Sequence, residues 1–406
     1  MQESTTFVAM DVHKKQHTIA MLLPDSQIPE QWTVVNTPPG IRRMVRRILR
    51  KAPGPVEICY EAGVCGFALQ RRIQAHGAVC KVIAPSLVPV APGQRIKTDR
   101  RDARKLAAYL RAGILTEVRP PDEEAESARD LVRRGEAAQA DLLRSQHRLL
   151  KFLLRRAMHY RDGSHWTQKH FRWLGGLRFE RARDTAIFNG YLAEVHHRRD
   201  QVAAVTDAIV AMAGESPYVE PVGWLRCFRG IDVLTAMTVV TELYSIERFV
   251  SPRQLMSYLG LVPWEASSGE CEHKGGITKT GNRRVRRVLV QAAWNQCRRV
   301  GLSPALKARR AGQPAWAIQL ADHAMRRLHR KYWHLINRGK LPKVAVVAVA
   351  RELVGFIWAA LYLKDQAPVY CIRRQARRDG TAHQRSAPAP RQTAAEFLGL
   401  AQPARR

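Results

Sequence analysis

The stretch Phe7-Val8-Ala9-Met10-Asp11 decides the fold of the N-terminal region, because it is a strand-like apolar run that ends in a carboxylate. A second alternating apolar run, 17–22, follows almost at once, and 31–36 is a third short strand-like run. Pro38-Pro39-Gly40 then breaks the strand pattern, and a basic amphipathic helix pattern begins at Ile41. The chain therefore opens with three strands before its first helix.

Strand and helix patterns alternate after this point: strands at 56–60 and 79–83, a helix at 67–73, and a helix from 99 onward with Leu106, Ala107 and Leu110 on one face. Three strands followed by this alternation are the element order of the ribonuclease-H-like fold. On that topology Asp11 lies on the central strand, and Glu61 ends the neighbouring strand. Asp99 and Asp102 are three residues apart, so they share one helix face.

These four carboxylates stand in a basic chain that has 67 Lys and Arg against 35 Asp and Glu. Each alone has an ordinary explanation: Asp99 as a helix N-cap, Asp102 as a first-turn residue, and Glu61 as a turn residue. Together they predict a nuclease-type site, where two divalent cations activate a water and stabilise a leaving oxygen. Hard cations need few carboxylates, so we expect Mg²⁺, with Mn²⁺ as the alternative, at Asp11, Glu61, Asp99 and Asp102.

The formal net charge of +32 points to a polyanionic partner, whose binding should weaken steeply with salt. A basic scaffold protein would share this charge, but the acidic cluster argues against that reading. At 406 residues we expect two or three domains.

Seven scattered cysteines without a CxxC pair favour a reducing cytosol and argue against a disulfide framework or a zinc site. The polar N-terminus lacks the apolar core of a signal peptide. The one long apolar stretch, 344–363, contains Arg351 and Glu352, and so predicts a buried helix and not a membrane span. The expected location is the cytoplasm.

The sequence pattern in the middle of the chain is typical of charged helices. Segments 122–160 and 178–212 carry apolar residues at heptad spacing, which predicts a coiled coil that serves dimerisation. Between them, 162–176 places aromatic residues among basic ones. Such a loop could stack on nucleic-acid bases or form a hairpin tip packed by its own tryptophans, and both readings stay open.

The third region contains a candidate nucleic-acid interface. Gly230-Ile231 between two apolar helix patterns is typical of a helix-hairpin-helix, whose turn offers backbone N–H groups to a phosphate. Glycines 275, 276 and 281 suggest a mobile loop before a basic helix. The residues expected to contact nucleic acid are Gly230, Lys274, Lys279, Arg283, Arg284, Arg286 and Arg287.

Several ordered motifs give these patterns a family resemblance. They are Asp11-Val12-His13-Lys14, Tyr60-Glu61-Ala62-Gly63, 97–103, Gly260-Leu261-Val262-Pro263, Ser268-Gly269 and Lys279-Thr280-Gly281-Asn282-Arg283. Over roughly residues 5–365, the chain resembles the bacterial insertion-sequence transposases that join an N-terminal DEDD (RuvC-like) domain to a C-terminal serine-bearing transposase domain. That family is described as bridge-RNA-guided recombinases.

The resemblance implies that the four carboxylates bind Mg²⁺ and that Ser268, which directly precedes Gly269, is the nucleophile. Ser267 would take this role if the register slipped by one. The implied partners are donor DNA, target DNA, a structured guide RNA and further copies of the chain in a dimer or tetramer, without a membrane. The expected domains are a RuvC-like domain at 1–120, a helical coiled-coil region at 121–220, a mostly helical transposase domain at 221–365 and a basic disordered tail at 366–406.

Three classes of function follow. The first is an RNA-guided DNA transposase or recombinase that uses the carboxylates together with a serine, forming a transient phosphoserine link to DNA. The second is a metal-dependent nuclease of the Holliday-junction type, in which water attacks and the serine takes no part. The third is a nucleic-acid-binding protein without catalysis. The serine motif and the second domain favour the first class.

Overall fold

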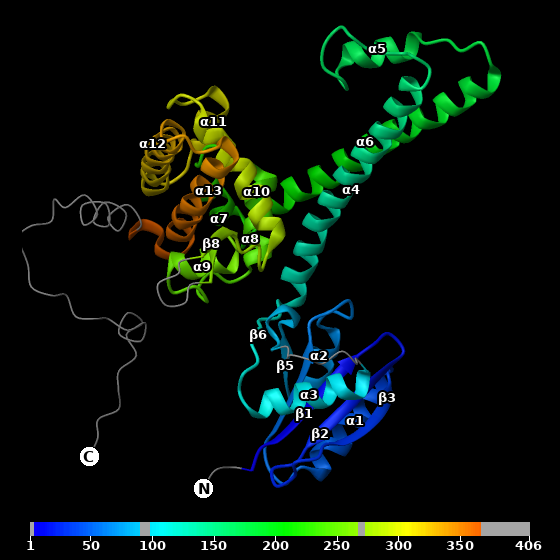
Figure 1. The fold of residues 1–406 in the computed structure, drawn as a ribbon, viewed down its shortest axis with the longest axis vertical. Helices are drawn as coiled ribbons and strands as arrows, with labels where there is room; N and C mark the ends of the chain where they lie inside the picture. The colour runs from blue at the N-terminus through cyan, green and yellow to red at the C-terminus, as the bar shows by residue number, and fades with distance from the viewer. Residues whose placement is uncertain (1–3, 90–97, 267–272, 367–406) are drawn as a thin grey trace, which may run out of the picture. The chain divides into compact units, whose positions relative to one another are not determined.

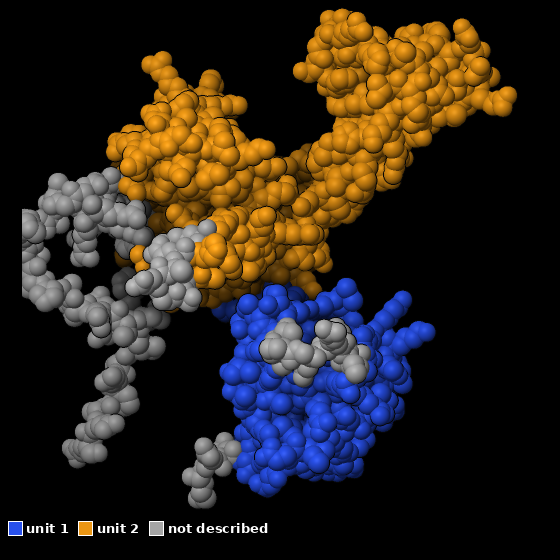
Figure 2. All heavy atoms as spheres, viewed as in Figure 1, with its two compact units in different colours: residues 1–122 blue, residues 123–406 orange. Residues whose placement is uncertain are grey.

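The computed structural model describes residues 4–89, 98–266 and 273–366. The chain forms two compact units, residues 1–122 and 123–406, which are coloured separately in Figure 2. The first is a mixed α/β unit and the second is mainly helical, as the sequence predicts. Each unit is described by itself below.

A six-stranded sheet forms the centre of the first unit (Figure 1). Its strand order is β3-β2-β1-β4-β5-β6. β1 runs antiparallel to β2 and parallel to β4, so the strand that carries Asp11 lies inside the sheet. The strands are β1 (Thr6–Val12), β2 (Gln16–Leu22), β3 (Glu30–Val35), β4 (Val56–Glu61), β5 (Val79–Ile83) and β6 (Glu117–Val118).

Helices cover both faces of this sheet, and strand alternation decides which side chains meet which helix. Met10 and Tyr60 lie in one core with residues of α1 (Pro38–Lys51) and α2 (Ala68–Gln74). Ala9 and Cys59 lie in the other core, with Ala103 and Leu106 of α3 (Asp99–Arg111). Alternation therefore places residues 11 and 61 on the face that α3 covers.

The N-terminus of α3 is fixed by contacts from outside the helix. The side chain of Thr98 caps it by accepting a hydrogen bond from Arg101 N. Gln31 on β3 donates to the carbonyl oxygen of Arg100 at 2.7 Å. At the other end of the helix, Arg111 donates to the carbonyl oxygen of Ser26 at 3.0 Å. The Gln31 contact ties the first turn of α3 to the sheet, and the Arg111 contact ties the last residue of the helix to the segment between β2 and β3.

The two heptad segments form one antiparallel helix pair within the second unit. The helices are α4 (Glu123–Leu154) and α6 (Ala182–Ala213), and they lie side by side in Figure 1. Val132 near the start of α4 packs in the same core as Ile209 near the end of α6, whereas Leu149 packs with Phe188. The heptads thus find their partner in the same chain, which corrects the expectation that they need a second copy.

The segment between these helices is a tip packed by its own rings. It contains α5 (Gln168–Gly176), where His170 is fully buried. The ring centroid of His170 lies 4.8 Å from that of Tyr160, 5.1 Å from that of Trp166 and 5.7 Å from that of Trp173. Burial, followed by the nearby charge of His165, lowers the pKa of His170 to about 4. The two tryptophans therefore serve the core of the tip, which favours the second reading of this loop.

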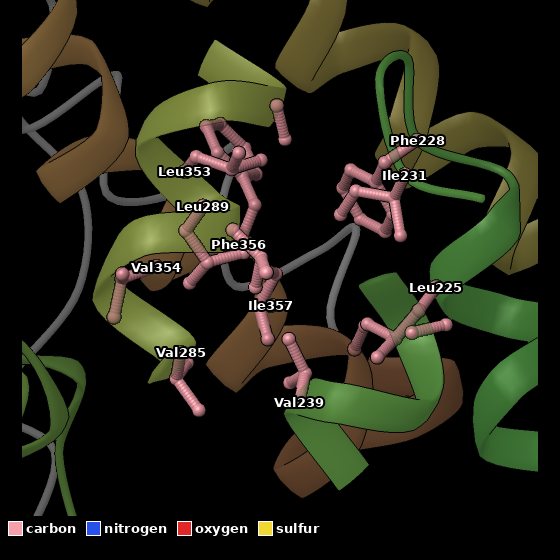
Figure 3. Close-up of a cluster of buried hydrophobic side chains, with 14 of the residues drawn as sticks. Leu225, Phe228, Ile231, Val239, Val285, Leu289, Leu353, Val354, Phe356 and Ile357 are labelled. Atoms are coloured by element: carbon pink, nitrogen blue, oxygen red, sulfur yellow. The ribbon is translucent and has the colours of Figure 1, made fainter. Parts of the chain in front are cut away.

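The rest of the second unit is a helical body around a large apolar core, part of which Figure 3 shows. Residues 342–363 are long and apolar enough to cross a membrane, but 61% of their most apolar window is buried inside the unit. They form a core helix, as expected. The elements are α7 (Val219–Arg226), α8 (Val233–Leu243), α9 (Pro252–Tyr258), β7 (Pro263–Glu265), β8 (Lys274–Ile277), α10 (Arg283–Trp294), η2 (Asn295–Cys297), α11 (Pro304–Arg310), α12 (Ala315–Asn337) and α13 (Pro342–Trp358).

Candidate active site and nucleic-acid interface

Two of the expected carboxylates converge at the end of β1. His13 Nε2 lies 3.3 Å from Asp11 Oδ2 and 3.5 Å from Asp99 Oδ2. One ligand atom from each of the three residues lies within 4.8 Å of the others. Asp11 is about three-quarters buried, whereas His13 and Asp99 are half exposed, so the cluster opens to solvent.

The electrostatics of this cluster favour a positive charge. Burial raises the pKa of Asp11, and the charges of Asp99 and Asp102 raise it further, although the hydrogen bond and charge of His13 lower it. Three ionised carboxylates thus repel one another at this place. A divalent cation would relieve that repulsion, and carboxylate oxygens are the ligands that hard cations prefer.

Neither Asp102 nor Glu61 belongs to the three-residue group. Asp102 is in the first turn of α3, close enough for its charge to act on Asp11. Glu61 is the last residue of β4, and its charge acts on Cys59, which lies in the core under α3. None of the four carboxylates lies on the opposite face of the sheet. Asp99 is not the cap of its helix, because Thr98 is.

His13 is the member of the cluster that the sequence analysis did not select. β1 ends at Val12, so strand alternation alone does not place His13 beside Asp11. The hairpin turn fixes it, with His13 N donating to the carbonyl oxygen of Gln16 at 3.2 Å. An imidazole beside carboxylates makes a mixed nitrogen and oxygen ligand set, which Mn²⁺ accepts more readily than Mg²⁺.

Ser267 and Ser268 lie outside the described residues, between β7 and β8. Two of the glycines near them, Gly275 and Gly281, have packing reasons, whereas a Cβ at Gly276 would meet nothing within 4 Å. Gly281 has φ +65°, and a Cβ there would meet the carbonyl oxygen of Tyr258 at 1.8 Å. A Cβ at Gly275 would lie 2.9 Å from the Trp264 ring. The expected contact residue Lys274 begins β8, and Lys279 is exposed with φ +56°.

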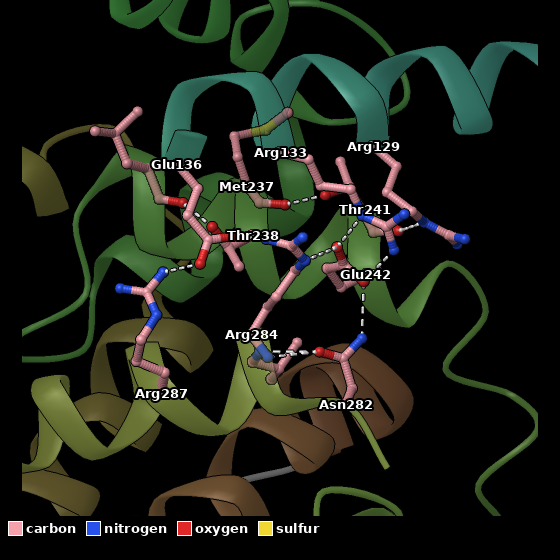
Figure 4. Close-up of polar contacts among 12 residues, drawn as sticks. Arg129, Arg133, Glu136, Met237, Thr238, Thr241, Glu242, Asn282, Arg284 and Arg287 are labelled. Carbon is pink, nitrogen blue, oxygen red and sulfur yellow. Dashed lines mark hydrogen bonds and ion pairs between the residues drawn. The ribbon is translucent and has the colours of Figure 1, made fainter. Parts of the chain in front are cut away.

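The basic helix α10 directs much of its charge into the protein (Figure 4). Arg284 and Arg287 both pair with Glu136 of α4, and the Arg287 contact is 2.9 Å. Arg286 donates to the carbonyl oxygens of Leu259 and Thr280 at 2.8 and 2.7 Å. Arg283 is exposed and has no hydrogen bond or ion pair to any residue that the structure describes. Of the four arginines, Arg283 is the one without such a contact to a described residue.

Glu242 of α8 is a buried carboxylate that links α8 to α4 and to the start of α10 (Figure 4). Arg133 of α4 donates to its two oxygens at 2.7 and 3.0 Å, and Asn282 donates at 2.8 Å. The same Asn282 caps α10 by accepting from the backbone N–H of residues 284 and 285. Glu242 therefore sets where α10, and the chain segment leading into it, begins.

Burial raises the pKa of Glu242, but the hydrogen bonds and charges of its partners outweigh burial and hold the pKa below the ordinary 4.5. A lowered folded-state pKa stabilises the fold above the unfolded pKa, and that stability is lost as pH falls through the folded pKa. Glu242→Ala should cost about 1–3 kcal/mol of unfolding free energy at neutral pH, because Arg133 and Asn282 lose their acceptor, although the 40% exposed Arg133 side chain can turn to water. Urea denaturation at pH 7 and at decreasing pH below 4.5 measures both effects.

The matched control is Glu220→Ala, since Glu220 is an exposed α7 residue without a hydrogen bond or ion pair in the described part of the chain. It should change stability by no more than about 0.5 kcal/mol. Equal stability of the Glu242 and Glu220 variants at neutral pH would contradict the role given to Glu242.

The turn between α7 and α8 needs its glycine for packing. Gly230 has φ +83°, and a Cβ there would lie 2.5 Å from the carbonyl oxygen of Ala292 and 2.8 Å from Asn295 Nδ2. Two residues later, Asp232 caps α8 by accepting a hydrogen bond from Thr235 N at 2.9 Å. The first free N–H groups of α8 are thus served by a side chain of the protein itself.

Comparisons with known proteins match two parts of the chain to transposase families. Residues 8–158 match a family model for the DEDD domain of IS110-type elements, described as "Transposase", and residues 224–309 match "Transposase IS116/IS110/IS902 family". The chain is 38% identical over 358 residues to a Sinorhizobium fredii (strain NBRC 101917 / NGR234) protein named "Putative transposase y4qE", covering 87% of each chain. It is 35% identical to the Leptospira borgpetersenii "Transposase for insertion sequence element IS1533", covering 82% of this chain and 97% of that one.

An α/β unit with clustered carboxylates, joined to a helical unit and matched over most of its length to transposases, defines a DNA-recombining enzyme. The chain belongs to the IS110/IS116/IS902 family of transposases. It therefore acts on DNA, and a DEDD transposase domain implies that divalent metal ions are bound.

Proposed function

We propose that this transposase cleaves and exchanges DNA strands with a carboxylate metal site in its first unit and a serine nucleophile in its second. The convergence of Asp11, His13 and Asp99 within the DEDD region is the observation that supports this most. In this proposal residues 1–120 are a ribonuclease-H-like (RuvC-like) catalytic domain. Support comes from the internal position of β1 and from the common face of Asp11 and Glu61.

The proposed metal ligands are Asp11, Glu61, Asp99 and Asp102, with His13 added from the geometry. Bound divalent cations supply polarisation of the scissile phosphate and activation of a hydroxyl. The residues themselves position the ligand atoms. Asp11, partly buried on a central strand, gives the site a rigid reference point, while the capped first turn of α3 presents Asp99 and Asp102 to it.

Ser268 is the proposed nucleophile, and Ser267 is its alternative. A bond forms between the serine oxygen and phosphorus as the bond from phosphorus to a deoxyribose oxygen breaks; the serine gives up its proton, and the deoxyribose oxygen leaves as a hydroxyl group that has taken up a proton. The number of phosphoester bonds is unchanged, so a second strand can be joined without ATP. A serine hydroxyl is a weak nucleophile, which is why it needs a base or a metal beside it.

We also propose that an RNA guide selects the target, and that the active species is a dimer or tetramer. The net charge of +32 supports an extensive polyanionic partner, and the family resemblance supports a structured RNA. Recombination requires two DNA duplexes held together, which favours more than one copy. Residues 121–220 form the helical middle region in this proposal, 221–365 the transposase domain with a helix-hairpin-helix-like segment at 219–243, and 366–406 a basic tail.

Removal of divalent metal tests the catalytic proposal. Chelation with EDTA should abolish strand cleavage of an insertion-sequence end by the purified protein, and Mg²⁺ or Mn²⁺ should restore it. DNA binding should persist in EDTA, because it rests on cationic side chains. Full cleavage in EDTA would overturn the metal site.

Sequencing the RNA that co-purifies with the protein from its native host tests the guidance proposal. One discrete structured RNA, encoded beside the transposase gene, is the expected result. Purification without enriched RNA, with recombination intact after ribonuclease treatment, would remove the guide. The second candidate function, a water-using nuclease of the Holliday-junction type, rests on the same carboxylate cluster and differs only in the role of the serine.

A further inference from the structure

A basic pocket of about 570 Å³ lies in the helical unit, and none of its lining residues belongs to the carboxylate cluster. It is formed by the turn between α7 and α8, by η2, by the loop 298–303 and by α11. Four arginines line it: Arg229, Arg298, Arg299 and Arg309. Asp232 is the one acidic residue among the lining residues.

Arg229 builds the wall of this pocket. Its guanidinium donates to the carbonyl oxygen of Arg298 at 3.1 Å and also to that of Gly301, which holds the loop 298–301 in place. The carbonyl oxygen of Arg229 in turn accepts from Gln296 at 3.1 Å. Burial lowers the pKa of Arg229, and the charge of Arg298 lowers it further, so the pocket concentrates positive charge.

Three guanidinium groups remain with hydrogen-bonding capacity. Arg298 and Arg299 are exposed, and neither side chain has a hydrogen bond or ion pair to any residue described. The Nε of Arg309 is buried without a hydrogen-bond partner in the described structure. The pocket thus offers cations and unfilled donors at one place.

Asp232 limits what the pocket can take. Its carboxylate caps α8 at the edge of the pocket, and its charge acts on Arg309. Because the carboxylate occupies the N-terminus of the helix, an anion must be held by the arginine side chains and not by the turn's own N–H groups. This differs from the backbone contact expected of Gly230.

We propose that the pocket binds a phosphodiester group of nucleic acid through Arg298, Arg299 and Arg309. Guanidinium groups match phosphate oxygens in charge and in forked geometry. Small-molecule pockets of this size are usually lined mostly by apolar side chains, whereas four guanidinium groups surround this one. The inference rests on the proposed DNA and RNA binding, and it names the place in the second unit where one strand is held.

Salt-dependent binding tests the pocket. A DNA duplex of 20 base pairs and a 20-nucleotide single-stranded RNA, both of unrelated sequence, are titrated with the full chain at several salt concentrations. Arg298→Gln combined with Arg299→Gln should reduce the slope of log affinity against log salt by about 1.8 for the duplex or about 1.4 for the single strand. The probe that shows the reduction identifies the strand that the pocket takes.

Two further variants separate the pocket from general charge. Asp232→Asn keeps the helix cap but removes the negative charge, so it should tighten binding by about two- to fivefold. Arg326→Gln with Arg330→Gln removes two exposed arginines of α12 outside the pocket and should change the slope less. A slope equally reduced by this control pair, or no tightening by Asp232→Asn, would assign binding to diffuse charge and overturn the pocket.

Binding by the wild-type protein separates a failure of the pocket from a failure of the proposed nucleic-acid binding. If it binds both probes with a steep salt slope that the pocket pair leaves unchanged, the pocket is wrong and the proposed DNA and RNA binding stands. If it binds neither probe, the proposed nucleic-acid binding fails together with the pocket.

Discussion

Asp11→Asn should lower the rate of DNA strand cleavage at least about a thousand-fold, equivalent to roughly 4 kcal/mol of transition-state stabilisation. Asp11 is the most buried member of the carboxylate cluster, and the substitution removes its charge while keeping its size. Stability at neutral pH should not fall. Burial and neighbouring carboxylates raise the pKa of Asp11, so its stabilising contribution is lost as pH rises and its ionised form is a cost to the fold.

The control is Asp25→Asn, which changes an exposed carboxylate in the same unit, outside the group that could hold a metal. Cleavage should continue at the wild-type rate in this variant. Thermal unfolding of both variants shows whether any loss of cleavage arises from unfolding. Wild-type cleavage by Asp11→Asn would remove the carboxylate cluster from catalysis.

Ser268→Ala should abolish strand exchange, a loss of at least about a thousand-fold, while fold and metal binding stay intact. Ser267→Ala is the matched control, because it makes the same change one residue away. If the Ser267 variant is inactive and the Ser268 variant active, the register is off by one. If both single variants and the double variant remain active, water is the nucleophile and the chain follows the nuclease mechanism.

A mixing experiment asks whether the two catalytic parts can come from different copies. Asp11 belongs to the first unit and Ser268 to the second. If sites are composite, mixing Asp11→Ala protein with Ser268→Ala protein should restore part of the activity. Light scattering should then report a dimer or tetramer. A stable monomer with nucleic acid bound would count against the oligomer, for which the heptads give no support because α4 and α6 pair within one chain.

Sequence patterns predicted the first unit well because they are local. Alternation along 7–11 and 56–61 places Asp11 and Glu61 on one face of the sheet, and the spacing of Asp99 and Asp102 places both on one side of α3. The basic charge and the ordered motifs led to the transposase family, which the comparisons show.

The use of each charged side chain was decided by tertiary structure. Arg287 looks like a nucleic-acid contact in sequence, yet it pairs with Glu136, 151 residues away. His13 joins the carboxylates only because a hairpin turn and the start of α3 meet beside it. Periodicity fixes which face of an element a residue occupies, and so the sequence by itself determined the elements and the acidic face. Which distant charges neutralise one another, and which arginines stay open to a ligand, depends on how those faces pack, and only the folded chain decided it.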